Sequence, residues 1–204
     1  MENWYPAKVN LPDTENTKTL AFLTRKFAPE TAFTYAEIGI YQAATAHAVL
    51  RQFANAQVWL FDFDHTIDAA RLCLAEYGDR VRYYGNTSRH LDSYNWPLMK
   101  IIAQTPEPVL DYVYLDGART VAVDALAFFL CDKLLKPGGY IEFDDYAWRL
   151  RGSSMDPTKV PVIGEQYTDE QIDSRQIKMI VDILVRPDKR YREIKANRIF
   201  RKTR

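Results

Sequence analysis

The chain has 204 residues, of which 47% are hydrophobic and 26% are charged, a composition typical of one folded domain and unlike that of a disordered or fibrous chain. Its 27 Lys and Arg residues balance its 27 Asp and Glu residues, so the bulk charge points to neither nucleic acid nor an anionic membrane. We therefore expect a single domain, 1–204, whose partner is neither of these.

The cysteines and the hydrophobic runs bear on the cellular compartment. Cys73 and Cys131 fall within predicted helices and lack the spacing of a redox or zinc motif, which is typical of small core residues in a reducing compartment. No apolar run is long enough to span a membrane, and residues 1–4 do not begin a signal peptide. We expect a cytoplasmic protein.

An N-terminal helical extension, 1–30, precedes the first strand. Asp13 or Thr14 can begin a helix that ends near Phe27, with Leu23 and Phe27 on one face. Such a helix can cover either a sheet edge or the mouth of a site, and the sequence does not choose.

The first predicted strand, 33–40, ends in the run E-I-G-I-Y-Q-A-A-T-A, after which a helix continues to about residue 53. A strand, a tight Gly turn and a helix N-terminus together present backbone N–H groups to the polar end of a ligand. Gly39 is the only glycine here, and Tyr41 and Ala43 add bulk where a dinucleotide fingerprint has glycine. A ligand with little phosphate is therefore favoured.

The second predicted strand, 58–61, runs into Asp62-Phe63-Asp64. An acid in this position is suitably placed to bind both hydroxyls of a ribose, and Asp62 is the first choice for that role. Asp64 is predicted to cap the next helix, 65–77.

The third predicted strand, 81–84, ends at Gly85-Asn86-Thr87. Asn86 presents both a donor and an acceptor and can bind a flat heterocycle such as adenine. An Asn beside Gly is equally typical of an ordinary turn, so both interpretations stay open.

A helix over 94–103 then leads to a fourth predicted strand, 109–115, which stops at Asp116-Gly117. Thr120 is expected to cap a helix over 121–135 that ends at Pro137-Gly138-Gly139. The predicted apolar face of this helix comprises Val121, Ala125, Phe128, Phe129 and Leu135, and its predicted solvent side comprises Asp124, Asp132 and Lys133.

The fifth predicted strand, 140–143, runs straight into Asp144-Asp145. Five alternations of strand and helix indicate an α/β fold with a doubly wound, mostly parallel sheet. Right-handed crossovers bring Asp116, Asp144 and Asp145 to the carboxyl edge of that sheet, where such folds bind ligands. Three gathered acids need a cation, hydrogen-bond donors or raised pKa values. The alternative is that each is an ordinary loop or cap residue.

The character of the chain changes after Asp145. Residues 151–161 show no periodicity, and we predict a substrate or lid loop over 146–168. Its aromatic residues can stack on a sugar or an aromatic ring, or they can simply pack. Thr168 can start a helix over 171–184, and strands 191–196 and 198–202 are expected to form a hairpin. The aromatic residues are Tyr146, Trp148 and Tyr167.

The order of these parts, from residue 33 to residue 202, resembles the class I S-adenosylmethionine-dependent methyltransferases. The acid-x-Gly turn of that family is matched by Glu37-Ile38-Gly39, and Tyr41 matches a tyrosine found in a subset. Ala43 and Thr45 stand where that subset has Gly and Ser. The run L-K-P-G-G at 135–139 is similar to the family's helix-to-strand turn. The resemblance implies a Rossmann-like fold with seven strands and a C-terminal antiparallel hairpin.

The resemblance also implies cofactor contacts. The loop 37–45 would surround the methionine portion of S-adenosylmethionine, the residues after the second strand would bind the ribose, and those after the third would lie near the adenine. The residues so implicated are Glu37, Gly39, Tyr41, Ala43, Thr45, Asp62, Phe63, Asn86, Thr87 and Asp116.

The runs L-D-G-A-R, 115–119, and F-D-D-Y, 143–146, are similar to metal-dependent O-methyltransferases of the catechol and macrocin types. By that likeness Asp116, Asp144 and Asp145 would hold a divalent cation. Mg²⁺ suits hard carboxylate oxygens, binds two vicinal hydroxyls and lowers the pKa of one.

Arg119 departs from the family, which often has His or Lys nearby to remove the proton. Arginine stays protonated, so it cannot be the base, but it can stabilise an oxyanion or orient an acidic substrate. Asp145, His90 and a metal-bound hydroxide are left open as the base. The predicted catalytic residues are Asp116, Arg119 and Asp145.

The activity implied is methyl transfer from S-adenosylmethionine to a hydroxyl of a small molecule, for which a sugar or natural product is one option, with help from a divalent metal. A metal-independent methyltransferase and a non-catalytic nucleotide- or cofactor-binding module are the alternatives. The acceptor cannot be inferred from the chain, and a homodimer is left open.

Overall fold

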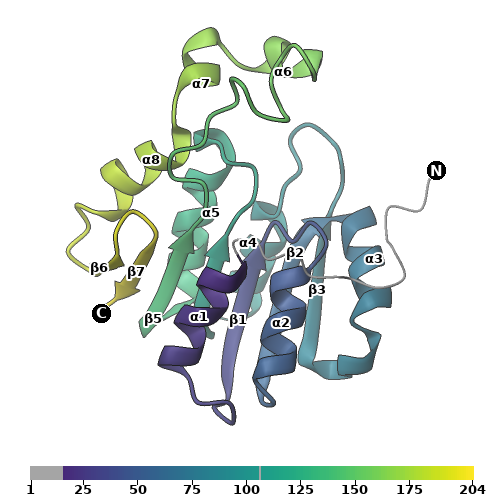
Figure 1. Cartoon of the computed structure of the whole chain (residues 1–204), viewed down its shortest axis with the longest axis vertical. Coiled ribbons are helices and arrows are strands. Elements are labelled where there is room, and N and C mark those ends of the chain that lie inside the picture. Colours follow the sequence, from purple (N-terminus) through teal and green to yellow (C-terminus); the bar gives the residue numbers. More distant parts are fainter. Residues whose placement is uncertain (1–15, 106) are drawn as a thin grey trace.

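The computed structural model of the chain describes residues 16–105 and 107–204 (Figure 1). The predicted helix start at Asp13 or Thr14 lies outside these residues. The helix itself is present as α1 (Asn16–Lys26).

Seven strands form one sheet in the order β3-β2-β1-β4-β5-β7-β6 (Figure 1). The first five strands are mutually parallel, and β7 pairs antiparallel with both β5 and β6. The predicted fold class, with its C-terminal hairpin, is confirmed. The strands are β1 (Phe33–Ile38), β2 (Ala56–Phe63), β3 (Val81–Asn86), β4 (Leu110–Leu115), β5 (Leu135–Phe143), β6 (Tyr191–Lys195) and β7 (Ile199–Lys202).

Helices cover both faces of the sheet, and alternate residues of the same strands face each layer because side chains in a strand point to opposite sides. On β1, Tyr35 belongs to the core shared with α1 and α2, whereas Ala36 and Ile38 belong to the core shared with α4 and α5. The helices along the sheet are α2 (Ala44–Gln52), α3 (Asp64–Cys73) with the 3₁₀ turn η1 (Ala75–Arg80), α4 (Asn95–Gln104) and α5 (Val121–Leu134).

The chain leaves β1 toward β2 on one side and reaches β4 on the other, so strand order reverses between β1 and β4. The carboxyl ends of strands at such a reversal border a crevice, which is where doubly wound sheets bind their ligands. The loops after β1, β2 and β4 therefore border the place where a ligand site is expected.

The predicted faces of α5 are wrong for four residues, although Lys133 is exposed as predicted. Asp124 and Asp132 are buried, whereas Val121 and Phe129 are 39% and 48% exposed. The two carboxylates are stable inside because each has partners from distant elements, which helical spacing does not reveal. Tyr94 donates to Asp124, and Tyr191 donates to Asp132.

The ends of two helices also differ from the prediction. The helix expected to end at Pro137-Gly138-Gly139 already ends at Leu134, because Leu135 starts β5 opposite Leu110 and the next residues form an irregularity in that strand. Asp64 is the first residue of α3 and not its cap, a position held by Phe63. Thr120 does occupy the cap position of α5, although its hydroxyl makes no capping bond.

Residues 147–174 form a lobe above the carboxyl ends of the parallel strands (Figure 1). The segment 151–161, predicted to be without structure, consists of turns that lead into α6 (Pro161–Gln166). Leu150, Ile163 and Ile172 give the lobe a small core of its own. The single helix predicted over 171–184 is split into α7 (Asp169–Asp173), α8 (Gln176–Ile180) and the π-turn η2 (Val181–Val185).

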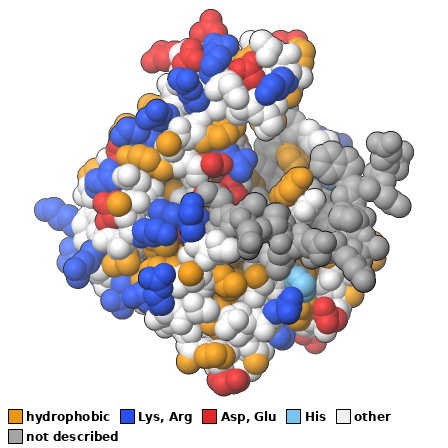
Figure 2. All heavy atoms as spheres, viewed as in Figure 1, with side chains coloured by type: hydrophobic (Ala, Val, Ile, Leu, Met, Phe, Trp, Pro, Cys, Tyr) orange, Lys and Arg blue, Asp and Glu red, His pale blue; other side chains and the backbone are white. Residues whose placement is uncertain are grey.

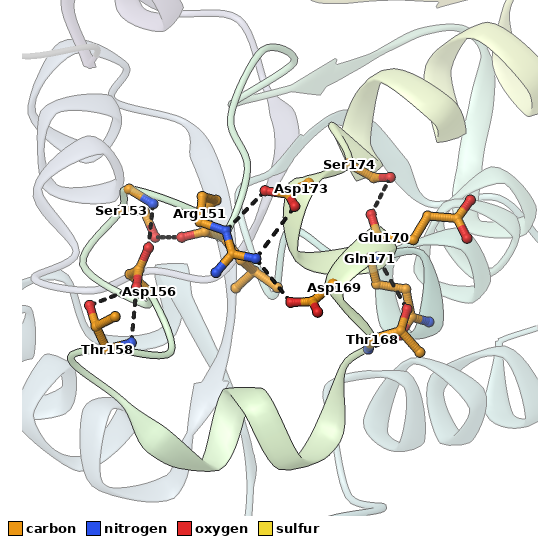
Figure 3. A network of polar contacts seen from close by, with 12 residues as sticks. Arg151, Ser153, Asp156, Thr158, Thr168, Asp169, Glu170, Gln171, Asp173 and Ser174 are labelled. Atoms are coloured by element: carbon orange, nitrogen blue, oxygen red, sulfur yellow. Dashed lines mark hydrogen bonds and ion pairs between the residues drawn. The ribbon is translucent and has the colours of Figure 1, made fainter.

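Polar contacts hold the turns of the lobe (Figure 3). Arg151 bridges Asp169 and Asp173 at 3.0 Å each. Asp156 accepts from the backbone N–H groups of Gly152, at 2.6 Å, and Thr158, at 2.9 Å. Short-range bonds of this kind replace regular structure where a segment is too small for a large core.

The start of α7 follows the prediction. Thr168 and Gln171 form a capping box, in which each side chain bonds to the backbone of the other residue. Among the residues described, no helix has both the length and the apolar character needed to cross a lipid bilayer.

Candidate functional site

The turn after β1 packs directly on the turn after β4. Gly39 has φ +83° and donates its N–H to the carbonyl of Phe61 at 2.8 Å, and a Cβ at this position would collide with the carbonyl oxygen of Asp116. The N–H of Asp116 in turn donates to Ile38 at 2.9 Å. Glycine is therefore required here for both its positive φ and its lack of a side chain.

Asp62 fastens the same turn from the neighbouring strand. Its carboxylate accepts the backbone N–H groups of Ile40 at 2.7 Å and Tyr41 at 3.2 Å, and also that of Phe63 at 2.7 Å. A carboxylate can accept about four hydrogen bonds, so Asp62 keeps capacity for a further donor. The structure thus brings Asp62 to the edge predicted for it and gives it a structural task there.

The loop 37–45, which is predicted to surround the methionine portion of the cofactor, has an unusual backbone. Tyr41 and Ala43 have φ values of +46° and +54°, in the left-handed region that L-residues rarely adopt. Glu37 lies buried beneath this loop, where Tyr35 donates to it at 3.1 Å and burial raises the pKa of its carboxyl well above the usual range. Thr45 is also buried, whereas Tyr41 is 67% exposed.

Asn86 ends β3 inside the protein. Its side-chain N–H donates to the carbonyl of Thr87 at 3.1 Å, while its buried Oδ1 has no partner among the described residues. A buried acceptor without a donor is costly, so Oδ1 is suited to a ligand N–H. Thr87 itself bonds to Asp92 through both its N–H and its hydroxyl, and Phe63 is 43% exposed.

Three acids lie together beyond β4 and β5, as predicted. One carboxylate oxygen from each of Asp116, Asp144 and Asp145 lies within 4.8 Å of the other two. Figure 2 shows this side of the molecule hollowed beneath the lobe, with acidic and basic side chains next to the hollow. The predicted gathering of the three acids is thus present in the structure.

Arginines pair with all three acids, although Asp116 and Asp145 are also partly exposed. Arg119 donates through Nη2 to Asp116 at 2.7 Å and through Nε to Asp145. Asp144 is approached by Nη1 of Arg198 at 3.1 Å, and its other oxygen accepts from the hydroxyl of Tyr114 at 3.0 Å.

Burial and the oppositely charged neighbours shift the pKa values of Asp116 and Arg119 in opposite directions. Burial raises the pKa of Asp116 to about 8, although the Arg119 guanidinium opposes that rise, and the Asp144 and Asp145 carboxylates add to it. For Arg119, burial disfavours the charged form, but the neighbouring Asp116 and Asp145 outweigh it and raise the pKa of the guanidinium. Arg119 therefore stays protonated.

A buried pair that the sequence did not single out holds the turn that carries Arg119. The hydroxyl of Tyr94 accepts from the N–H of Ala118 at 3.0 Å and donates to Asp124, which also accepts from the N–H of Thr120 at 3.1 Å. Burial raises the pKa of Asp124 to about 6. An acid in the first turn of α5 is the one sequence signal that points to this role.

The remaining candidates have other partners. His90 is exposed and its ring contacts Gln166 of α6 at 3.4 Å. The hydroxyl of Tyr146 donates to Asp182 at 2.9 Å, and Tyr167 packs on the lobe core. Trp148 packs there too, and its ring lies 5.6 Å from the guanidinium carbon of Arg119. Trp148 thus connects the lobe to the acids.

The partners of the carboxylate oxygens decide whether the acid cluster fits a divalent cation. Hard carboxylate oxygens are the right donors for Mg²⁺. Asp116 and Asp145, however, both give an oxygen to Arg119, and Asp144 is engaged by Tyr114 and Arg198. In this arrangement the cluster does not fit a divalent cation unless Arg119 moves away.

Comparison with known proteins gives a likeness in structure. No protein-family model and no curated protein matches the sequence. A Klebsiella pneumoniae protein described as an O-methyltransferase superposes with a TM-score of 0.60 at 16% identity, over 97% of this chain and 84% of the other. A Staphylococcus aureus protein described as a caffeoyl-CoA O-methyltransferase gives 0.59 at 14%, over 93% and 84%.

An O-methyltransferase from Bacillus cereus with bound SAH gives a TM-score of 0.54 at 17% identity, over 90% of this chain and 84% of the other. At these identities the likeness is one of fold, and it extends over nearly the whole chain. The resemblance predicted from the sequence is confirmed at that level.

Proposed function

We propose that this chain, which has the fold of class I methyltransferases, transfers a methyl group from S-adenosylmethionine to a hydroxyl of a small molecule. The observation that supports this most is the meeting of the Gly39 turn, Asp62 and Asp116 at the reversal of strand order. That meeting occurs in a fold shared with several O-methyltransferases, although fold alone does not fix a reaction.

The cofactor contacts are proposed for the loops at this edge. The carboxylate of Asp62 would bind the ribose hydroxyls beyond the backbone N–H groups that it already accepts. Asn86 would bind the adenine, which is supported by the buried Oδ1 that has no partner among the described residues. The loop 37–45, which includes Tyr41, Ala43 and Thr45, would enclose the methionine portion.

The reaction proposed is a direct displacement. The acceptor oxygen forms a bond to the methyl carbon while the carbon–sulfur bond breaks, and the sulfur keeps the electron pair and becomes neutral. The hydroxyl proton leaves to a carboxylate, for which Asp145 is our choice. Arg119 stays charged and stabilises the negative charge that develops on oxygen.

The divalent cation implied by the sequence remains a prediction. The separation of at most 4.8 Å among one oxygen each of Asp116, Asp144 and Asp145 supports it, and the ion pairs of Arg119 count against it. Activity that survives dialysis against a chelator would remove the metal from the proposal.

The acceptor class and the assembly are also proposals. The lid predicted over 146–168 falls within the lobe and its entry, and Trp148 is the aromatic residue of this segment that reaches Arg119. An acceptor with a flat ring, or a sugar, would suit that neighbourhood. The assembly proposed is a homodimer.

Calorimetry with S-adenosylmethionine tests the cofactor. We expect one molecule to bind per chain and Asp62→Ala to weaken binding strongly, while Asp68→Ala, a change of an exposed acid on α3, leaves it intact. Failure of the unaltered protein to bind would end the proposal, and an unaffected Asp62→Ala would remove Asp62 from the site. Thermal unfolding of each variant shows whether its fold is kept.

A non-catalytic cofactor-binding module is the second candidate. It is supported by the ion pairs of Arg119, which already engage Asp116 and Asp145, two of the predicted catalytic residues. The transfer of a labelled methyl group to a panel of sugars and phenols separates the two. Cofactor binding without any labelled product across such a panel favours the module.

A further inference from the structure

The cluster of Asp116, Asp144 and Asp145 already contains a positive charge supplied by the chain. We infer that the guanidinium of Arg119 takes the place that the sequence resemblance gives to a divalent cation, so that the reaction proceeds without a metal. This inference rests on the proposed methyl transfer and specifies its electrostatics.

The first support is the way Arg119 uses the carboxylates. Two different nitrogens of one guanidinium, Nη2 and Nε, bond to Asp116 and Asp145, which lie on separate loops after β4 and β5. Such a planar fork matches two carboxylate oxygens and carries a permanent charge. A divalent cation would need the carboxylates of the same two residues, so the two cations compete for one place.

The second support is that Arg119 is held by the backbone and is not a free surface side chain. Arg119 and Asp145 have φ values of +61° and +55°, a conformation that is unfavourable for both residues. The residues on either side of Arg119 are fixed by the buried pair of Tyr94 and Asp124. The two strained residues bond directly to one another, so the strain and the ion pair belong to the same feature.

The third support comes from the parts of the guanidinium that do not bond to Asp116 or Asp145. Trp148 lies 5.6 Å from its central carbon, within the range of a cation–π contact. Nη1 has no hydrogen-bond partner among the residues that the structure describes. Its N–H groups remain available to an acceptor oxygen, which is what a metal would otherwise bind.

Binding of Mn²⁺, followed by electron paramagnetic resonance, tests the inference directly. We expect no saturable binding to the unaltered protein up to millimolar Mn²⁺. Arg119→Met removes the competing charge and should create one site, with affinity higher by at least tenfold or so. Arg151→Met is the matched control: it removes another arginine that bridges two aspartates, and it should bind no more Mn²⁺ than the unaltered protein.

Binding of SAH to the same samples separates the two proposals. One tight Mn²⁺ site in the unaltered protein, lost in Asp145→Asn, would overturn the metal-free site even if SAH binds normally. Failure to bind SAH would overturn the proposed methyl transfer, whatever the Mn²⁺ result. The titration of the unaltered protein decides the inference even if Arg119→Met does not fold.

Discussion

Two clusters in this molecule have the same composition, an arginine between two aspartates, in very different surroundings. The inner cluster is Arg119 with Asp116 and Asp145, and the outer cluster is Arg151 with Asp169 and Asp173. The side chains of the inner cluster are 33%, 23% and 27% exposed, against 38%, 91% and 51% in the outer one. The inner cluster also contains two residues with positive φ, and the outer one has none.

This difference in exposure indicates which of the two clusters contributes more to stability. Water and salt screen the outer cluster, which only closes turns of the lobe, so its contribution is small. The inner cluster stands on the carboxyl ends of buried strands, and removal of one partner leaves charges that are partly desolvated. We therefore expect the two regions to respond differently to the same kind of change.

The largest expected effect concerns the hydrophobic core of the lobe, which is separate from the main core around the sheet. Leu150→Ala truncates one of the buried residues of the lobe core and should lower the free energy of opening of the lobe by roughly 2–5 kcal/mol. Hydrogen exchange checks this: the amides of Ile163 and Ile172 should lose protection while that of Ile141 in β5 keeps it. Equal loss at Ile141 would show that the lobe unfolds together with the sheet. Leu115→Ala, in the main core, is the control that should affect every amide.

The next prediction concerns the buried acid that supports the inner cluster. Because burial raises the pKa of Asp124 from 3.8 to about 6, the folded chain binds this proton more tightly than the unfolded chain does. The contribution of Asp124 to stability is therefore full below pH 4 or so and is lost as the pH rises through about 6. Asp124→Asn should remove this loss, which reaches about 3 kcal/mol once the pH is well above 6.

Urea unfolding of both proteins at several pH values measures this change. Parallel stability curves would contradict the assignment. Asp156 in the lobe gives a control of opposite sign, because N–H groups of Gly152 and Thr158 lower the pKa of its carboxyl to about 2. Its contribution is present above pH 4 or so and is lost as the pH falls toward about 2, and Asp156→Asn should abolish that loss.

The sheet and the inner cluster were largely within reach of the sequence. Apolar strands that end in Gly or Asp fix the topology, and parallel topology alone brings Asp62, Asp116 and Asp144 to one edge. The need for glycine at position 39 followed from its turn, although its contact with Asp116 did not. These features depend on local patterns and on the handedness of crossovers.

The inward side of α5 and the structure of the lobe were beyond the sequence. Asp124 and Asp132 are buried because Tyr94 and Tyr191, from distant parts of the chain, hydrogen-bond to them. Helical spacing contains no information about such partners. The lobe depends on a core of Leu150, Ile163 and Ile172, too small and too dispersed to give a periodic signal.

A smaller effect tests the geometry of the inner cluster. Arg119→Lys keeps the charge but replaces a planar fork by a point charge, which cannot bond to Asp116 and Asp145 in the same way. We expect a loss of about 1 kcal/mol in the free energy of unfolding, since the charge is kept and one bond is lost. Urea titration measures it. An unchanged stability would mean that the charge of Arg119 stabilises the inner cluster and that the planar geometry of its guanidinium does not.

The smallest effect should come from the outer cluster, and it completes the comparison. Arg151→Met removes a guanidinium that bonds to Asp169 and Asp173, of which Asp169 is almost fully exposed. Because water solvates both aspartates once the arginine is gone, the midpoint of thermal unfolding should stay within experimental error of that of the unaltered chain. A clear fall in the midpoint would show that Arg151 supports the sheet as well as the lobe, and the two clusters would then differ only in degree.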